Sequence, residues 1–426
     1  MQYQFPMSFS LAVRLKRLFT FKMRVFLIAG LCVGFFITTV ISRNLDDLHN
    51  VRSFGLLTNT LGQRNNANLQ TLRLVQVLFR HGDRTPIDRF PKDPYDSRKF
   101  WPEGFGRLTK RGKLMQYELG QYIRLRYNGF INETYTPEEI YVQSSNYDRT
   151  IMSAMANLAG MWPSKDLEFP EGGRQQFVPV HVISSQIDNK IAFSKPCPRY
   201  AQISKEIQTQ QSEVLFNNEH ADLYKYLSEH TGLEVKSYSN VSDIYDTLFV
   251  QTAHNLTLPE WTKEVFPDKL RPMAHKWIKM QTHTPEMRRL KAGPLLTDIL
   301  RNMKRASEKP SEAELKVLEA LFHTPAAKFF MYSGHDTTIT ALLDALDLYS
   351  GVIPPYASSL YFELHELPQP IGYTVKIFYR AGLENPATEL HLKGCGSGPC
   401  KLEDFEKSLR DFIIDEKEWE TECNLK

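Results

Sequence analysis

The sequence predicts an α/β fold, because short apolar runs of strand length alternate with helical patterns. One such run, Leu72–Phe79, leads directly into R-H-G-D-R, and a second, at 328–332, leads into S-G-H-D and then a helix. Alternating apolar residues at 360–364 and 373–379 predict two late strands joined by a turn at 368–372. Ligands usually bind such folds at the carboxyl ends of strands, where both histidine-containing loops are expected.

Periodicity predicts further elements between these strands. Apolar residues recur at helical spacing from Thr109 onward, and residues 139–142 form a short strand. A second helix follows with Asp148 as its N-cap, and we expect its buried face to include Met155. Residues 202–310 have mainly helical patterns, which we interpret as a cap inserted into the α/β domain.

The composition of the 426-residue chain is that of a globular protein, with 42% hydrophobic and 24% charged residues. A net charge of +3 gives no indication of a nucleic-acid partner. The N-terminal part differs, because residues 1–24 are basic and residues 25–41 are apolar or small throughout. Two interpretations stay open: an uncleaved signal anchor, which we favour because the basic stretch is long, and a cleaved signal peptide. A buried core helix is the third alternative.

The signal anchor would make the chain a single-pass type II membrane protein, and a signal peptide would make it secreted; a lysosomal location is a further alternative. In all of these cases the body is extracellular or luminal. The predicted organisation is a basic cytoplasmic tail at 1–24, the apolar segment at 25–41, a flexible stalk at 42–70, an α/β domain at 71–201 and 311–426, and the helical cap at 202–310.

Cysteines and sequons agree with an oxidising compartment. A local disulfide can close the Gly-rich loop between Cys395 and Cys400, in which case Cys197 would pair with Cys423. The alternative is a set of free thiols or half of a zinc site, although no second pattern completes a metal. Three sequons are candidate glycosylation sites, at Asn132, Asn240 and Asn255.

An anion site is expected at the end of the first strand, where Arg80 and Arg84 flank His81. Guanidinium groups are always charged and match phosphate oxygens, and a neutral imidazole is a nucleophile. Arg149 begins a predicted helix just after a strand, which is a natural position for a residue that binds anions. The alternative is that R-H-G-D-R is a solvated charged loop.

His335 and Asp336 follow the second buried strand and complete a set of groups for phosphate monoester hydrolysis. His335 can join the arginines as a clamp, and Asp336 can protonate the leaving oxygen if it is held protonated. No metal or other cofactor is needed, because the arginines supply positive charge. The alternative is a metal site that includes Asp83, although two arginines beside His81 would repel a cation.

The segment R-H-G-D-R-T-P at 80–86, with H-D at 335–336, resembles the histidine acid phosphatases, the acid branch of the histidine phosphatase superfamily. The similarity covers roughly residues 71–426 and is closest to the prostatic, lysosomal and insect venom acid phosphatases. It implies a phosphoglycerate mutase-like fold, with a mixed central sheet flanked by helices and an inserted α-helical cap.

The resemblance also implies a role for each candidate residue. His81 would form a phosphohistidine and Asp336 would be the proton donor, and some relatives form homodimers. The phosphate-binding residues would be Arg80, Arg84, Arg149 and His335. The four cysteines match the family's disulfide positions, although one further disulfide is absent here, since its two positions correspond to Val250 and Ser359. Lysosomal relatives have a C-terminal membrane span, whereas the segment 415–426 is polar.

The leading functional hypothesis is an acid phosphatase that acts on small-molecule phosphomonoesters or phosphoproteins. One alternative is a specialised phosphatase of the same family, with a lysophospholipid or inositol phosphate as its substrate. Another is a catalytically inactive binding glycoprotein. The presence of a suitable residue at every expected catalytic position argues against this alternative.

Overall fold

The computed structural model describes residues 67–163, 176–308 and 327–424. The expected basic tail, the apolar segment and nearly all of the stalk lie outside these residues, so the choice between anchor and signal peptide stays a prediction. Across the described ranges, no helix is both long enough and apolar enough to cross a bilayer. Residues Asn65–Lys426 group into one compact unit.

The described strands form one mixed sheet in the order β3-β2-β4-β1-β5-β6-β7. Strand β1 pairs in parallel with β4 and antiparallel with β5, so it joins the parallel part of the sheet to the antiparallel part. The predicted mixed α/β sheet is therefore confirmed. The strands are β1 Leu72–Arg80, β2 Ile140–Ser144, β3 His181–Val182, β4 Phe329–Gly334, β5 Ser359–Leu367, β6 Gly372–Arg380 and β7 Thr388–Leu390.

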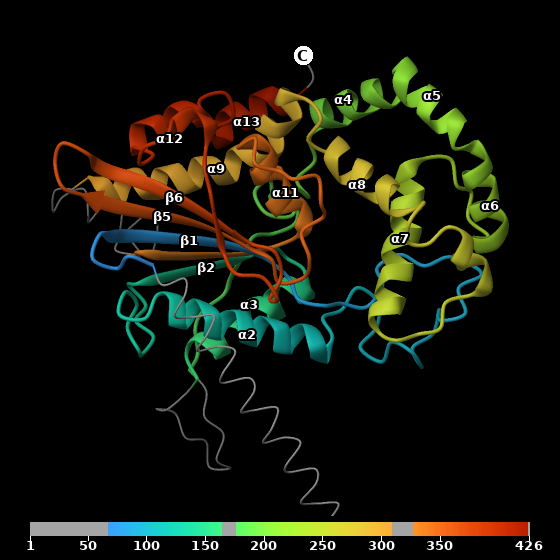
Figure 1. Cartoon of the computed structure of the whole chain (residues 1–426), viewed down its shortest axis with the longest axis horizontal. Coiled ribbons are helices and arrows are strands. Elements are labelled where there is room, and N and C mark those ends of the chain that lie inside the picture. The colour runs from blue at the N-terminus through green and yellow to red at the C-terminus, as the bar shows by residue number, and fades with distance from the viewer. Residues whose placement is uncertain (1–66, 164–175, 309–326, 425–426) are drawn as a thin grey trace, which may run out of the picture. The chain divides into compact units, whose positions relative to one another are not determined.

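Helices cover both faces of this sheet (Figure 1). Helices α2 and α3 pack on one face, and α9, α11 and α12 pack on the other, each over a continuous apolar core. The helices of these layers are α2 Lys110–Arg126, α3 Asp148–Met161, α9 Pro285–Ser307, α11 Asp336–Ala345, η2 Lys393–Cys395, α12 Leu402–Leu409 and α13 Glu416–Cys423.

The helices between β3 and α9 include those of the expected cap. Side chains of α6, α7 and α8 share a small apolar core with Phe90, separate from the cores on the sheet. Helix α9 was expected in the cap, but its Leu295 and Ile299 lie in the core on the sheet. We therefore propose that the cap ends before Pro285. The remaining helices are α4 Pro198–Gln208, α5 Gln211–Glu219, α6 Ala221–Thr231, α7 Tyr238–Ala253, η1 Glu260–Glu264 and α8 Arg271–Met280.

Helices α2 and α3 approach each other closely through two glycines. A Cβ on Gly120 would lie 1.9 Å from the Asn157 carbonyl oxygen, and one on Gly160 would lie 2.0 Å from the Tyr117 oxygen. The prediction that Met155 is buried was wrong, because it is 53% exposed. The buried face of α3 consists largely of small and polar residues that permit this approach, which an apolar pattern does not reveal.

The structure contains both expected disulfides, Cys197–Cys423 and Cys395–Cys400. The first joins the start of α4 to the end of α13, and the second closes the Gly-rich loop before α12. Two of the three sequon asparagines, Asn132 and Asn255, are exposed, and Asn240 is half-buried in the first turn of α7. Glycosylation itself stays a prediction.

We expect Gly120→Ala to lower the free energy of unfolding by about 1–3 kcal/mol, because the added methyl group overlaps the Asn157 carbonyl and forces α2 and α3 apart. Chemical denaturation measures the change. Gly398→Ala is the matched control, since no atom lies within 4 Å of the position of its Cβ. Equal stability of the two variants would contradict the close approach of the helices.

Candidate active site

The parallel pairing of β1 with β4 brings the two histidine segments together. Arg80 lies opposite Gly334 in the register, and the His81 amide donates to the Gly334 carbonyl at 3.0 Å. The ring centroids of His81 and His335 are 5.6 Å apart. The carboxyl ends of two adjacent parallel strands thus place both rings in one site, as the sequence predicted.

His81 is held as a neutral ring. Its Nδ1 lies 2.8 Å from the Gly82 carbonyl oxygen, which can only accept, so Nδ1 carries the proton and Nε2 keeps a free lone pair. Burial, together with the charges of Arg80 and Arg149, lowers the pKa of His81 well below its ordinary value. The ring is therefore uncharged even in mildly acidic solution, and a nucleophilic imidazole must be uncharged.

Gly82 lets the loop after β1 pass against the first turn of α2. A Cβ at this position would lie 2.2 Å from the Gly112 carbonyl oxygen, a distance that no side chain can occupy. Farther along the same helix, the Gln116 amide donates to the Arg80 carbonyl at 2.8 Å. The backbone around His81 is therefore fixed by α2 as well as by β4.

The arginines of the site carry orphaned donors. Arg80, Arg84 and Arg149 each have a buried Nε–H with no acceptor among the described residues. Buried donors are normally paired, so three such groups around one imidazole indicate a site for an acceptor from outside the chain. Guanidinium donors form their strongest hydrogen bonds with anionic oxygens, which favours a phosphate.

Carboxylates partly balance this positive charge. Arg80 Nη2 lies 2.7 Å from Asp336 Oδ2, and Arg84 makes two hydrogen bonds, of 3.0 and 2.9 Å, to Asp246 on helix α7. Burial alone would raise the pKa of Asp336, but Arg80 and Arg84 outweigh it and the pKa is lowered. Asp336 is therefore ionised in this state, whereas a proton donor must be protonated.

Arg149 lies at the start of α3, as expected, but Tyr147 takes the N-cap position predicted for Asp148, and Asp148 begins the helix. The Arg149 guanidinium lies 4.5 Å from the Tyr147 ring centroid, and that ring lies 5.3 Å from the His335 ring. Burial and the charge of Arg84 lower the pKa of Arg149 to about 10. The guanidinium stays charged in acid.

His335 Nε2 lies 2.9 Å from the hydroxyl of Ser145, which directly follows β2 and also contacts Thr150 Oγ1 at 2.9 Å. Burial and Arg149 lower the pKa of His335 to about 3, although Asp336 acts in the opposite direction. A phosphate dianion beside the ring would oppose these causes and favour its protonation.

Several residues of the site were not predicted from the sequence. Ser145 orients His335, and Asp246 reaches Arg84 from the cap. Asp83 accepts hydrogen bonds from Thr109 at 2.5 Å and pairs with His254 at 2.9 Å. Ser145 lies four residues before Arg149, between the predicted strand and the predicted helix, but no local signal marks residues 246 or 254.

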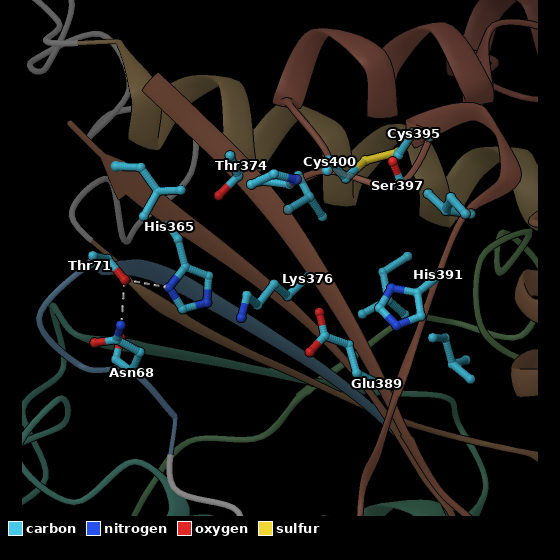
Figure 2. A pocket seen from close by; sticks show the side chains of 18 residues that line it. Asn68, Thr71, His365, Thr374, Lys376, Glu389, His391, Cys395, Ser397 and Cys400 are labelled. Atoms are coloured by element: carbon cyan, nitrogen blue, oxygen red, sulfur yellow. Dashed lines mark hydrogen bonds between the residues drawn. A yellow bond between two sulfur atoms is a disulfide. The ribbon is translucent and has the colours of Figure 1, made fainter. Parts of the chain in front are cut away.

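A cavity lies away from the site, between β6, β7 and the loop closed by Cys395–Cys400 (Figure 2). This cavity has a volume of about 520 Å³ and is lined by His365, Lys376 and His391 among others, but by none of the predicted catalytic residues. Throughout the described residues, no group of three or more metal-binding side chains is arranged to hold an ion.

Comparison with known proteins identifies the family to which the chain belongs. A family model for the histidine phosphatase superfamily, branch 2, matches residues 71–380. Human lysosomal acid phosphatase is 36% identical over 361 residues, which cover 84% of this chain and 81% of that protein. Human prostatic acid phosphatase is 38% identical over 370 residues, covering 83% of this chain and 88% of that protein.

Solved structures agree on the fold. The phytase from Citrobacter braakii superposes with a TM-score of 0.59 at 20% identity, covering 84% of this chain and all (100%) of that one. Hafnia alvei phytase in complex with tartrate gives 0.60 at 17% identity, covering 84% and 99%. The fold and sequence together define a histidine phosphatase: the chain belongs to the histidine phosphatase superfamily, branch 2. Within that superfamily it is an acid phosphatase, a hydrolase of phosphate monoesters.

The low pKa of His335 makes the stability of the fold depend on pH. As the pH falls below about 6.5, the unfolded chain binds a proton at this histidine, whereas the folded chain does not until about pH 3. The unfolded state binds more protons in this window, so the free energy of unfolding decreases as the pH is lowered. This group contributes at most about 1.4 kcal/mol per pH unit to that decrease.

We therefore expect His335→Asn to reduce the slope of unfolding free energy against pH between pH 6.5 and 4. Denaturant titrations at a series of pH values measure it. His391→Asn, at an exposed histidine outside the site, tests whether the loss of any imidazole has the same effect. A wild-type slope in His335→Asn would show that His335 is not held neutral by the fold.

Proposed function

We propose that this acid phosphatase hydrolyses its substrates through a phosphohistidine on His81. The observation that carries the proposal is the state of that ring: it is buried and neutral, with Nδ1 bound to a carbonyl and Nε2 free. Attack by Nε2 forms the N–P bond as the P–O bond to the leaving group breaks. Water then attacks phosphorus, the N–P bond breaks, and inorganic phosphate leaves.

The phosphate oxygens would be held by Arg80, Arg84, Arg149 and His335. The orphaned Nε–H groups of the three arginines support this assignment, since a dianionic phosphoryl group offers the acceptors that the described residues do not. Positive groups fixed before the substrate binds stabilise the charge that is redistributed in the transition state.

Asp336 would protonate the leaving oxygen and later take a proton from the attacking water. In the free protein it is ionised and paired with Arg80. A phosphate that takes hydrogen bonds from Arg80 weakens this pair, and its own negative charge favours protonation of the carboxylate. We infer that the acid acquires its proton when substrate binds, and acidic solution supplies that proton.

The substrate class is phosphate monoesters of small molecules or phosphoproteins. The phytases that share the fold are too distant in sequence to favour inositol phosphates here, and no described contact favours a lysophospholipid. We propose that the enzyme works in an extracellular or luminal compartment, anchored or released according to the fate of residues 25–41. Two disulfides and relatives described as lysosomal and prostatic support this location. A homodimer stays a prediction.

His81→Ala should abolish both the turnover of p-nitrophenyl phosphate at acidic pH and the trapping of a phosphorylated protein, because it removes the Nε2 atom that would attack phosphorus. Brief mixing with ³²P-labelled substrate, followed by denaturation in base, preserves an N–P bond for detection. His391→Ala, at an exposed histidine, should retain both signals. Persistent labelling of the His81 variant would exclude this nucleophile.

Asp336→Asn should slow alkyl phosphates much more than p-nitrophenyl phosphate, since a good leaving group departs without a proton. A loss of about 100-fold or more in kcat is expected for the poor leaving group, within the usual range for general acid catalysis. Measuring kcat for a graded series of leaving groups tests the role. Equal losses across the series would mean that the carboxylate does not protonate the leaving oxygen.

A further inference from the structure

Tyr356 lies beneath the arginines of the site. Its ring centroid is 4.3 Å from the Arg80 guanidinium and 5.9 Å from that of Arg84, and it is 5.7 Å from the His81 ring. The residue is 8% exposed. Among the described residues, no other aromatic ring lies within cation–π distance of both Arg80 and Arg84.

The segment that carries Tyr356 is fastened to the catalytic loop on both sides. Arg80 Nη1 donates to the Pro354 carbonyl at 2.6 Å, and the Ala357 amide donates to the His81 carbonyl at 3.2 Å. The position of Tyr356 relative to the nucleophile is therefore set by backbone contacts of its neighbours rather than by its own side chain. These contacts fix the backbone on either side of Tyr356, and its ring packs between Arg80 and His81.

The Tyr356 hydroxyl is buried and makes no hydrogen bond to any described residue. Leaving such a group unsatisfied costs roughly 1–3 kcal/mol, so buried tyrosine hydroxyls normally have a partner. Burial, opposed by Arg84, raises the pKa of Tyr356 to about 12. The group is thus a neutral O–H donor at every pH at which an acid phosphatase works.

We propose that the Tyr356 hydroxyl donates a hydrogen bond to the phosphoryl group held at His81, as an additional phosphate-binding residue. The inference deepens the proposed function and rests on it, since it assumes a phosphate among these arginines. The buried donor and the orphaned guanidinium donors point to the same acceptor, an anionic oxygen from outside the chain. The ring meanwhile supports the guanidiniums through cation–π contact.

Tyr356→Phe separates the hydroxyl from the ring, because phenylalanine keeps the aromatic face against Arg80 and Arg84. A hydrogen bond to a charged group is worth about 1.5–3 kcal/mol, which corresponds to at least about a 10-fold change in affinity. We expect the inhibition constant of inorganic phosphate to rise by that factor and kcat/KM for p-nitrophenyl phosphate to fall comparably. The thermal midpoint without phosphate should be unchanged or higher.

Tyr122→Phe is the matched control. Tyr122 is also buried, its ring lies 4.0 Å from the Arg380 guanidinium, and its hydroxyl likewise has no partner among the described residues. It lies on α2 and contacts none of the predicted catalytic side chains, so its variant should bind phosphate as the wild type does. An equal effect in both variants would mean that any buried hydroxyl matters, and would overturn the proposal.

Phosphate binding can be followed without catalysis, as the rise of the thermal midpoint on adding inorganic phosphate. Wild-type stabilisation and a wild-type inhibition constant in Tyr356→Phe would refute the hydrogen bond. His81→Ala measured in parallel keeps the two proposals apart. If that variant loses turnover while Tyr356→Phe is unaffected, only the role of Tyr356 fails; if His81→Ala keeps its activity, the mechanism itself fails.

Discussion

Buried positive charge is the constraint on which the site depends. Three guanidiniums surround one imidazole, and the fold balances them with two carboxylates, Asp246 and Asp336. The remaining imbalance is what lowers the pKa of both histidines beyond the effect of burial. It also makes the site electrostatically incomplete, so that a dianion is attracted into a position where the histidines have been kept neutral.

The cap takes part in this balance. Helix α7 provides Asp246 to Arg84 and, one residue beyond its end, His254 to Asp83, so two successive residues of the catalytic loop are held from the cap. Asp83 is also bonded to Thr109, whose side chain caps the first turn of α2. The loop is thus fixed from the sheet, from α2 and from α7 at once. A substrate that contacts the cap would therefore touch a surface joined directly to Arg84, one of the proposed phosphate-binding residues.

The sequence was sufficient for features that depend on neighbouring residues. A buried strand followed by R-H-G places His81 at the carboxyl end of a central strand, and a second strand followed by G-H-D places His335 beside it. It was insufficient where the partner is distant along the chain. Asp246 is 162 residues from Arg84, and nothing near either residue indicates the pair. The packing of helix α9 on the sheet could not be predicted for the same reason: periodicity identifies a buried face but does not identify what buries it.

The proposed mechanism requires an inversion of the usual order of two pKa values. At a mildly acidic pH the nucleophilic histidine must be neutral and the aspartic acid must be protonated, whereas in water histidine holds its proton to higher pH than aspartate does. The free site meets the first requirement, because burial and the arginines keep His81 neutral. The same arginines prevent the free site from meeting the second requirement, because they lower the pKa of Asp336 and keep it ionised. A ligand that engages Arg80 and also carries negative charge opposes the second effect, and a phosphate monoester dianion does both. Burial, the largest cause of the low pKa of His81, still acts in the complex. In the proposed mechanism the substrate therefore completes the catalytic apparatus, since Asp336 becomes a general acid only in the complex.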